Sequence, residues 1–431
     1  MGPSIEYLVS SPYGDIPADK NNWDLPLEGD AFKTPYRTYF HSIKDFLSID
    51  EFKLLLSSVS KKLEKEICLK EIYEIIVRSE KHGFLYHPSS IEVILKDDRV
   101  KFGLNVAISD IGRHWLREEF FILKRLNTKF NLHYLPEPYF CGELNSILFL
   151  LEDWFEGYHE FHISKNKEGK QRLKLWNFSN SGSGYTYLSS EQSFEIYKQA
   201  SKILTLYYDF RDFSQIYPWH HAAGDFVVKM GNDNNSPSPK PSHQGRVNKR
   251  EDSSRVRVVE DKKEIFHRGR GHPALIPSPL AGEGKGERYF KDKIDVRLTT
   301  ARRYESLMVL RDKDPVNPFL GLFCFFLNLT IRMRMDKLDG LGEVVWADDT
   351  CLEATVKGFL EALKLKKGLK HYIGSAEDFL RLLKSFGEED LKITLNPVID
   401  LYSKEEGFSV LIENLENHIK KLYVILQSLP S

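Results

Sequence analysis

The sequence predicts an α+β protein, and three observations carry that prediction. Short strands surround one amphipathic helix in residues 84–153, the chain beyond residue 189 is mainly helical, and residues 231–290 have no apolar period that could build a core. The chain of 431 residues is 41% hydrophobic, which is enough for two or three domains or for one large two-lobed one.

Charge and cysteine usage narrow the class of protein. The 61 basic and 62 acidic residues nearly cancel, so we expect no nucleic-acid partner. Cys68, Cys141, Cys324 and Cys351 lack the spacing of a disulfide framework or a zinc site, which favours a reducing cytoplasm. The N-terminal residues lack a secretory signal pattern, and the most apolar run, 319–331, is too short to cross a bilayer. We therefore expect a cytoplasmic protein with no membrane span.

Residues 1–68 are predicted to form an extended arm followed by a helical cap. Residues 1–42 are rich in Pro, Gly and aromatic side chains without a sustained period, which is typical of an arm docked on a domain. Ser48 and Glu51 match a capping box at the start of an amphipathic helix. A second helical segment is expected at 69–79.

The period then changes to that of a small antiparallel sheet. Turn-like residues separate short apolar runs, and one helical stretch interrupts them. Three strands, one helix and two further strands are expected at residues 84–87, 90–96, 99–108, 110–126, 139–144 and 146–157.

The second half of the chain is predicted to be helical around one β-hairpin. Ser189, with Gln192 three residues on, matches a capping box. Further helices are expected at 318–334, at 350–366 with Asp349 as N-cap and Gly368 as stop, at 376–386 with Ser375 as N-cap, and at 408–427.

Residues 231–290 are predicted to be a disordered insertion, because Pro, Gly, Ser and charged residues dominate them. Their PSPLAGEGKGE portion resembles a translated interspersed bacterial repeat. Without the insertion, FVVKM and KIDVRLTT would be adjacent strands of one hairpin.

Three short motifs follow one another along the chain: NVAIS, LLEDWFEG and PWHHAAGDFVV. The first of them ends at Ser109. With the predicted strands and helix, they make residues 70–370 similar to the protein-kinase-like superfamily, in the style of bacterial aminoglycoside phosphotransferases and lipopolysaccharide-core kinases. The resemblance implies a two-lobed fold with a small lobe at 69–157 and a helical large lobe at 158–230 and 291–431.

The resemblance also implies where a nucleotide would bind. VAIS is similar to the VAIK of active kinases, so Ser109 stands at the position of the lysine that pairs with the phosphates. Glu118 or Glu119 would be the helix glutamate that pairs with this lysine, or else a solvated surface charge. The hinge-like stretch contains Glu152, Asp153 and Trp154, where an adenine would meet the backbone or where a strand simply ends in a surface turn.

In the third motif, Asp225 falls at the metal-binding asparagine of the family pattern, and His220 falls at the catalytic aspartate. A histidine can act as a general base near neutral pH, so His220 or His221 is the candidate base. The second magnesium ligand of the family would lie at Thr299 or Thr300, where this sequence has no carboxylate.

These departures favour a pseudokinase-like binding or regulatory protein with an unknown protein partner. The alternative is a divergent phosphotransferase that uses ATP and magnesium on a sugar or aminoglycoside-like small molecule. A structural interaction protein without a cleft ligand is a third class. Four guanidinium groups, at Arg302, Arg303, Arg332 and Arg334, could bind a phosphorylated or acidic ligand. Alternatively, they could pair within a helical domain with Asp336, Asp339, Asp348 or Asp349.

Overall fold

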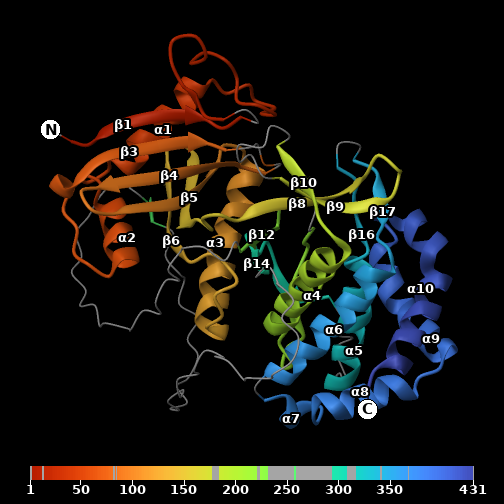
Figure 1. Cartoon of the computed structure of the whole chain (residues 1–431). Helices are drawn as coiled ribbons and strands as arrows, with labels where there is room; N and C mark the ends of the chain where they lie inside the picture. The colour runs from red at the N-terminus through yellow and green to blue at the C-terminus, as the bar shows by residue number, and fades with distance from the viewer. Residues whose placement is uncertain are drawn as a thin grey trace.

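Two large sheets and a set of helices build the fold, which is of the predicted mixed α+β class. The computed structural model describes residues 2–430 except 12–13, 81–82, 84, 177–183, 221–223, 232–256, 259–293, 308–316, 340–341 and 367. Figure 1 shows the larger sheet, with strands β1, β3, β4 and β5, on one side of the molecule and most helices on the other.

The larger sheet has eight strands in the order β13-β6-β7-β5-β4-β3-β1-β2. All neighbouring strands are antiparallel except β1 and β3, which are parallel. The strands are β1 (Ser4–Val9), β2 (Ile16–Pro17), β3 (Ile72–Ser79), β4 (His87–Leu95), β5 (Arg99–Ala107), β6 (Pro138–Leu144), β7 (Ile147–Asp153) and the two-residue β13 (Arg257–Val258).

Helices cover both faces of this sheet. Successive residues of a strand point to opposite faces, and on β7 Phe149 joins the core formed with α1 (Tyr36–Leu47) and α2 (Lys53–Leu63). Leu148 and Leu150 instead join the core formed with α3 (Asp110–Phe130). This second core continues into the rest of the chain, so α3 connects the large sheet with the helical part.

A second sheet of five strands, in the order β10-β9-β8-β12-β14, packs against α4 (Ser190–Tyr207). The predicted hairpin is confirmed, because β12 pairs antiparallel with β14. The strands are β8 (His159–Lys165), β9 (Gln171–Trp176), β10 (Tyr185–Tyr187), β12 (Phe226–Met230) and β14 (Ile294–Leu298).

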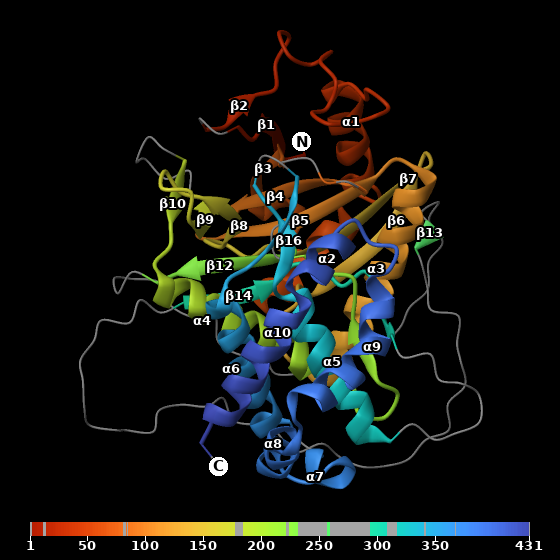
Figure 2. The same ribbon diagram turned by 90° about the vertical axis from the view of Figure 1, so that its right-hand side faces the viewer.

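The remaining helices pack against one another in the C-terminal part of the chain, and α6 (Asp349–Leu365) packs against α4 (Figure 2). Two short two-stranded sheets, β11–β15 and β16–β17, lie among them. These elements are β11 (Ser214–Ile216), β15 (Tyr304–Ser306), α5 (Pro318–Arg332), β16 (Met335–Lys337), β17 (Val344–Trp346), α6 (Asp349–Leu365), α7 (Leu369–Tyr372), α8 (Ala376–Ser385), α9 (Glu388–Ile399) and α10 (Phe408–Ser428), with short 3-10 helices at Leu69–Glu71 and Asp400–Tyr402.

Several predicted elements are confirmed. Ser189 and Gln192 form the capping box of α4, and Ser375 caps α8. The helix predicted at 408–427 is α10. The N-cap of α6 is Asp348 rather than Asp349, because the carboxylate of Asp348 accepts the exposed amides of the first turn.

Most of the wrong secondary-structure predictions concern the N-terminal part of the chain. Residues 72–79 form strand β3 rather than a helix, and the sheet has eight strands rather than five. The supposed arm contributes β1 to this sheet and contains helix α1. Ser48 ends α1 instead of starting a helix. The strands β8, β9 and β10 were not predicted, and all of the proposed insertion except Gly231 and β13 lies outside the described residues.

Candidate functional site

Asp225 lies directly before β12, and the hairpin with β14 brings it beside the segment that follows Leu298. The Thr299 amide donates to the Asp225 carbonyl at 2.7 Å, and the Thr299 hydroxyl donates to the Gly224 carbonyl at 2.8 Å. Gly224 has a φ of +76°, which favours glycine, and an added Cβ there would lie 2.8 Å from the Glu160 carboxylate. The turn before β12 is therefore held tightly against the end of β14.

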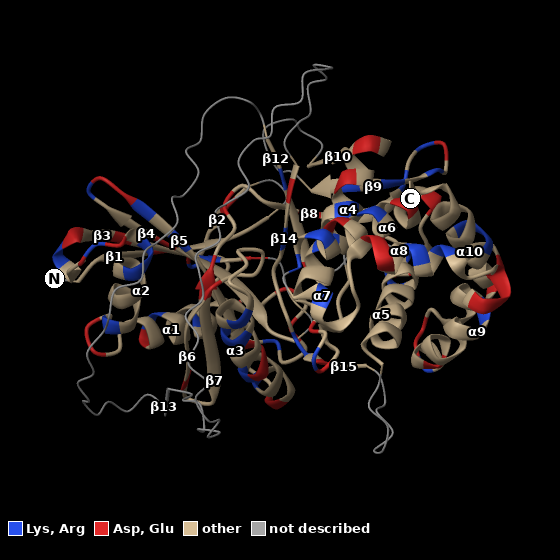
Figure 3. Cartoon of the chain, turned by 90° about the horizontal axis from the view of Figure 1, so that it is seen from below, with Lys and Arg blue, Asp and Glu red and all other residues tan. Residues whose placement is uncertain are grey.

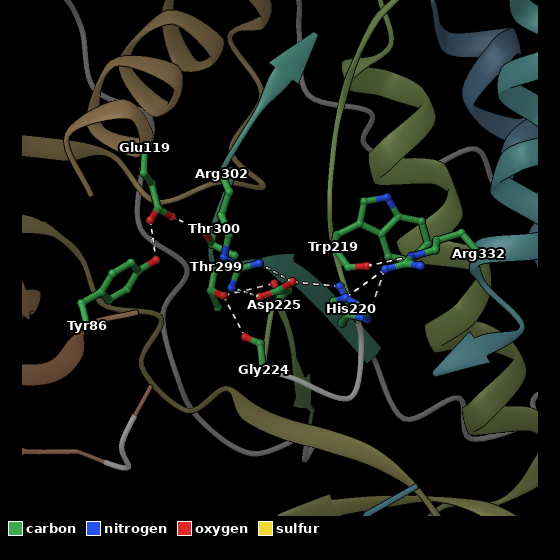
Figure 4. A network of polar contacts seen from close by, with 10 residues as sticks. All are labelled: Tyr86, Glu119, Trp219, His220, Gly224, Asp225, Thr299, Thr300, Arg302 and Arg332. Atoms are coloured by element: carbon green, nitrogen blue, oxygen red, sulfur yellow. Dashed lines mark hydrogen bonds and ion pairs between the residues drawn. The ribbon is translucent and has the colours of Figure 1, made fainter. Parts of the chain in front are cut away.

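The Asp225 side chain is buried and bound to a guanidinium (Figure 4). Arg302 donates to its two carboxylate oxygens at 2.7 and 2.8 Å, and the His220 amide donates to one of them at 2.8 Å. Burial lowers the pKa of Arg302, but the charge of Asp225, the hydrogen bonds to it and the nearby Tyr86 and Glu119 together outweigh burial, so the pKa is raised and the group stays charged. This is a bidentate, charge-assisted ion pair.

Glu119 projects from α3 into the same region, where two hydroxyl groups bind it (Figure 4). Tyr86 donates to one carboxylate oxygen and Thr300 donates to the other. Burial raises the pKa of Glu119, against the opposing effects of Arg302 and the two hydroxyl donors. The alternative of a solvated surface charge is therefore wrong for Glu119, whereas Glu118 is exposed.

Glu152, near the end of β7, is a second buried carboxyl group. Asn105 on the neighbouring strand donates to its Oε1 at 2.9 Å, while Oε2 has no hydrogen-bond partner among the described residues. Burial and the charge of Glu119 raise the pKa of Glu152 well above its usual value. Both effects favour the protonated, neutral form of this carboxyl group.

The other hinge-like residues make structural contacts. Asp153 accepts from Lys62 at 2.8 Å and from the Tyr139 hydroxyl at 2.9 Å. The Trp154 ring lies 4.4 Å from the Lys101 ammonium. These contacts connect β7 with α2, β5 and β6.

Ser109 lies apart from this network. It is the N-cap of α3, where its hydroxyl accepts from the Gly112 amide at 3.0 Å. The position that the sequence resemblance assigned to phosphate contact is thus a helix cap. On the preceding strand, Asn105 is the residue that contacts the buried Glu152 carboxyl group.

His220 connects the Asp225 ion pair with a second arginine. Arg332, buried at the end of α5, donates to the His220 Nε2 at 2.9 Å and to Glu405 at 2.5 Å. Because a guanidinium only donates, Nε2 must carry a lone pair in this contact. Tyr217 also donates to Glu405, at 2.8 Å. His221, the other candidate base, lies outside the described residues.

Sequence reasoning placed His220 and Asp225 together correctly but missed the groups that bind them. Arg302 was considered only as a possible ligand contact or as a partner of the aspartates at 336–349. Tyr86 carried no signal, since a single hydroxyl in a sequence has no pattern, and Thr300 was considered only as a residue at the position of the second magnesium ligand. Of the four arginines, Arg334 pairs with Asp349 as the alternative reading proposed.

A scan against protein-family models and searches of curated proteins and of solved structures found no match to this chain. Among the described residues, no group of three or more His, Cys, Asp or Glu side chains is arranged to hold a metal ion. None of the described helices is both long and apolar enough to cross a membrane.

Proposed function

We propose that the chain is a protein-kinase-like protein that acts by binding or regulation and does not transfer phosphate with magnesium and ATP. The observation that carries the proposal is the ion pair between Asp225 and Arg302. In the kinase pattern, Asp225 stands at a magnesium ligand, and here a guanidinium occupies its carboxylate.

The order of strands supports the kinase-like part of the proposal. The strands β3, β4 and β5, then α3, then β6 and β7 follow the order of a kinase small lobe, and β6-β7-β5-β4-β3 are neighbours in one sheet. His220 and Asp225 come shortly before the β12–β14 hairpin in the chain, as the residues of a catalytic loop would.

The chemistry of the site supports the absence of phosphotransfer. Mg²⁺ needs hard oxygen ligands, and Thr299 and Thr300 stand where the family has its second aspartate. Glu119 binds two hydroxyl groups rather than a lysine. The His220 Nε2 lone pair accepts from Arg332, so it is not free to take a substrate proton.

Thermal-shift titration with ATP tests the proposal, in magnesium and again in EDTA. Asp225 is already bound to Arg302, so we expect any stabilisation by ATP to be equal in the two buffers. A larger shift in magnesium, lost in Asp225→Asn but kept in the control Asp97→Asn at an exposed turn, would overturn the proposal. Hydrolysis or transfer of the γ-phosphate that depends on Asp225 would also overturn it.

A further inference from the structure

A pocket of about 490 Å³ is lined in part by His220. It lies between Trp115 of α3, the Tyr217–His220 stretch, the end of α5 with β16, and the residues 405–407 before α10. Such a volume is in the range that takes a small organic molecule.

Three cationic side chains line this pocket: Arg303, Arg332 and Lys337. Arg332 is fully engaged, by the Trp219 carbonyl, His220 and Glu405. The other two are at the rim, where the Arg303 side chain is 50% exposed and that of Lys337 is 53% exposed. The rim cations are therefore the groups that a ligand would meet first.

The rim cations have donors to spare. The Arg303 guanidinium has five N–H groups, and its hydrogen bonding to the described residues is one 3.4 Å contact with Glu305, while its plane lies near the Trp115 ring. Lys337 contacts Glu406 at 2.9 Å, and both side chains are mostly exposed. Exposed pairs of this kind contribute only about 0–1 kcal/mol, so a ligand can displace them.

The acidic groups of the pocket are, in contrast, already used. Glu405 accepts from Tyr217 with one oxygen and from Arg332 with the other. Asp336 is buried and accepts from the Lys337 amide at 2.7 Å. Glu406 is the acid that the Lys337 contact holds at the rim. The unfilled hydrogen-bonding capacity is thus on the donor side.

Apolar side chains complete the lining, from Pro218, Met335 and Val344. A bare inorganic ion would leave this surface unused, whereas an organic molecule would cover it. Lys and Arg as well as Asp and Glu occur along α8 and α10 (Figure 3), so these helices carry no single sign of charge that would select a large polyanion.

We propose that this pocket binds a small organic molecule through a phosphate or carboxylate group that Arg303 and Lys337 hold. Guanidinium and ammonium groups with unused donors recognise this oxyanion chemistry. The proposal stands beyond the function proposed above, because it requires neither a nucleotide nor a magnesium ion at Asp225.

Calorimetric titration of the full chain tests the proposal, with phenyl phosphate and benzoate as the two oxyanion arms and benzylamine as the cationic counter-probe. We expect saturable binding of at least one oxyanion and none of benzylamine. Whichever oxyanion binds more tightly identifies the group that the pocket prefers. Failure of both oxyanions to bind, or tighter binding of benzylamine, would overturn the proposal.

Three rim variants locate the site. Arg303→Ala and Lys337→Ala should each weaken oxyanion binding about tenfold or more, because each removes a charge-assisted hydrogen bond. Glu406→Gln should strengthen it, because Lys337 loses its competing partner, whereas a cationic ligand would bind more weakly to that variant. The matched control is Arg381→Ala, since Arg381 forms a similar exposed pair with Asp378 on α8. An equal loss of affinity in Arg381→Ala would refute the site.

The outcome is separable from that of the ATP titration. Arg303→Ala leaves Asp225 and Arg302 in place, so it should not change the response to ATP in magnesium or in EDTA. Loss of oxyanion binding with an unchanged ATP response would confirm a separate site. Parallel loss of both would contradict its separation from the Asp225 network.

Discussion

Arg302 and Arg303 are neighbours in sequence, yet their side chains lie in two regions that differ in how completely their charged groups are paired. Arg302 points to the buried Asp225 and forms two short hydrogen bonds with it. Arg303 points to the pocket, where a single 3.4 Å contact joins it to an exposed glutamate. In the region of Asp225, the buried charges are neutralised by residues of the chain itself. In the pocket, the guanidinium of Arg303 retains N–H donors that a ligand could use.

Removal of the Arg302 side chain should have the largest effect on the stability of the fold. Arg302→Ala leaves the buried carboxylate of Asp225 without its counter-charge, which we expect to lower the free energy of unfolding by about 3–5 kcal/mol. Denaturant unfolding measures this loss. A loss below about 1 kcal/mol, which is the level of exposed pairs, would contradict the role of Arg302.

A double-mutant cycle with Asp225→Ala sharpens the result, because it isolates the interaction between the two side chains. The coupling should be favourable and should fall little with added salt, since buried pairs are screened less than exposed ones. The exposed pair of Arg381 and Asp378 provides the comparison.

The next largest loss of stability should follow from a change at Thr300, which connects the segment after β14 with α3. Thr300→Val keeps the shape of the side chain but removes the donor to the buried Glu119. An unsatisfied buried acceptor costs about 1–3 kcal/mol of unfolding free energy. Thr186→Val, on the exposed face of β10, is the matched control and should change stability by less than about 0.5 kcal/mol.

The buried acids predict a pH dependence with a defined sign. Because the pKa of Glu152 is raised in the folded chain, the folded state keeps a proton that the unfolded state releases above its ordinary pKa. Stability is therefore lost as pH rises from the unfolded pKa to the folded pKa, with a slope of up to about 1.4 kcal/mol per pH unit.

Glu152→Gln removes this titration while its amide oxygen can still accept from Asn105. We expect the variant to gain stability relative to the wild type as pH rises through that window, in unfolding curves measured at several pH values. Glu118→Gln on the exposed side of α3 is the matched control. A difference between Glu152→Gln and wild type that stays constant with pH would contradict the raised pKa.

The features that sequence predicted well are those set by local rules. A capping box identified the start of α4, the N-cap Ser375 identified the start of α8, and apolar periodicity identified α10. The aromatic-rich segment that contains α1 and the strand β3 were misassigned. In both, short apolar runs fit more than one period, and packing against the sheet decides between them.

In the candidate site, too, the features that could be predicted are those that local sequence determines. His220 and Asp225 are five residues apart in the sequence, so their proximity could be predicted from the chain. The pairing of Asp225 with Arg302 depends on the β12–β14 hairpin and on the direction that the chain takes after it. Sequence could predict that hairpin, but not which of two adjacent arginines would turn inward.

The smallest effect on stability is expected from Arg303→Ala, which completes the comparison with Arg302→Ala. Its side chain is half exposed and its one carboxylate contact is long, so the free energy of unfolding should change by no more than about 0.5 kcal/mol. The same unfolding measurement applies to both variants. If Arg303→Ala lost several kcal/mol instead, Arg303 would be part of the structural core of the site, and the pocket would not have the spare donors that oxyanion binding requires.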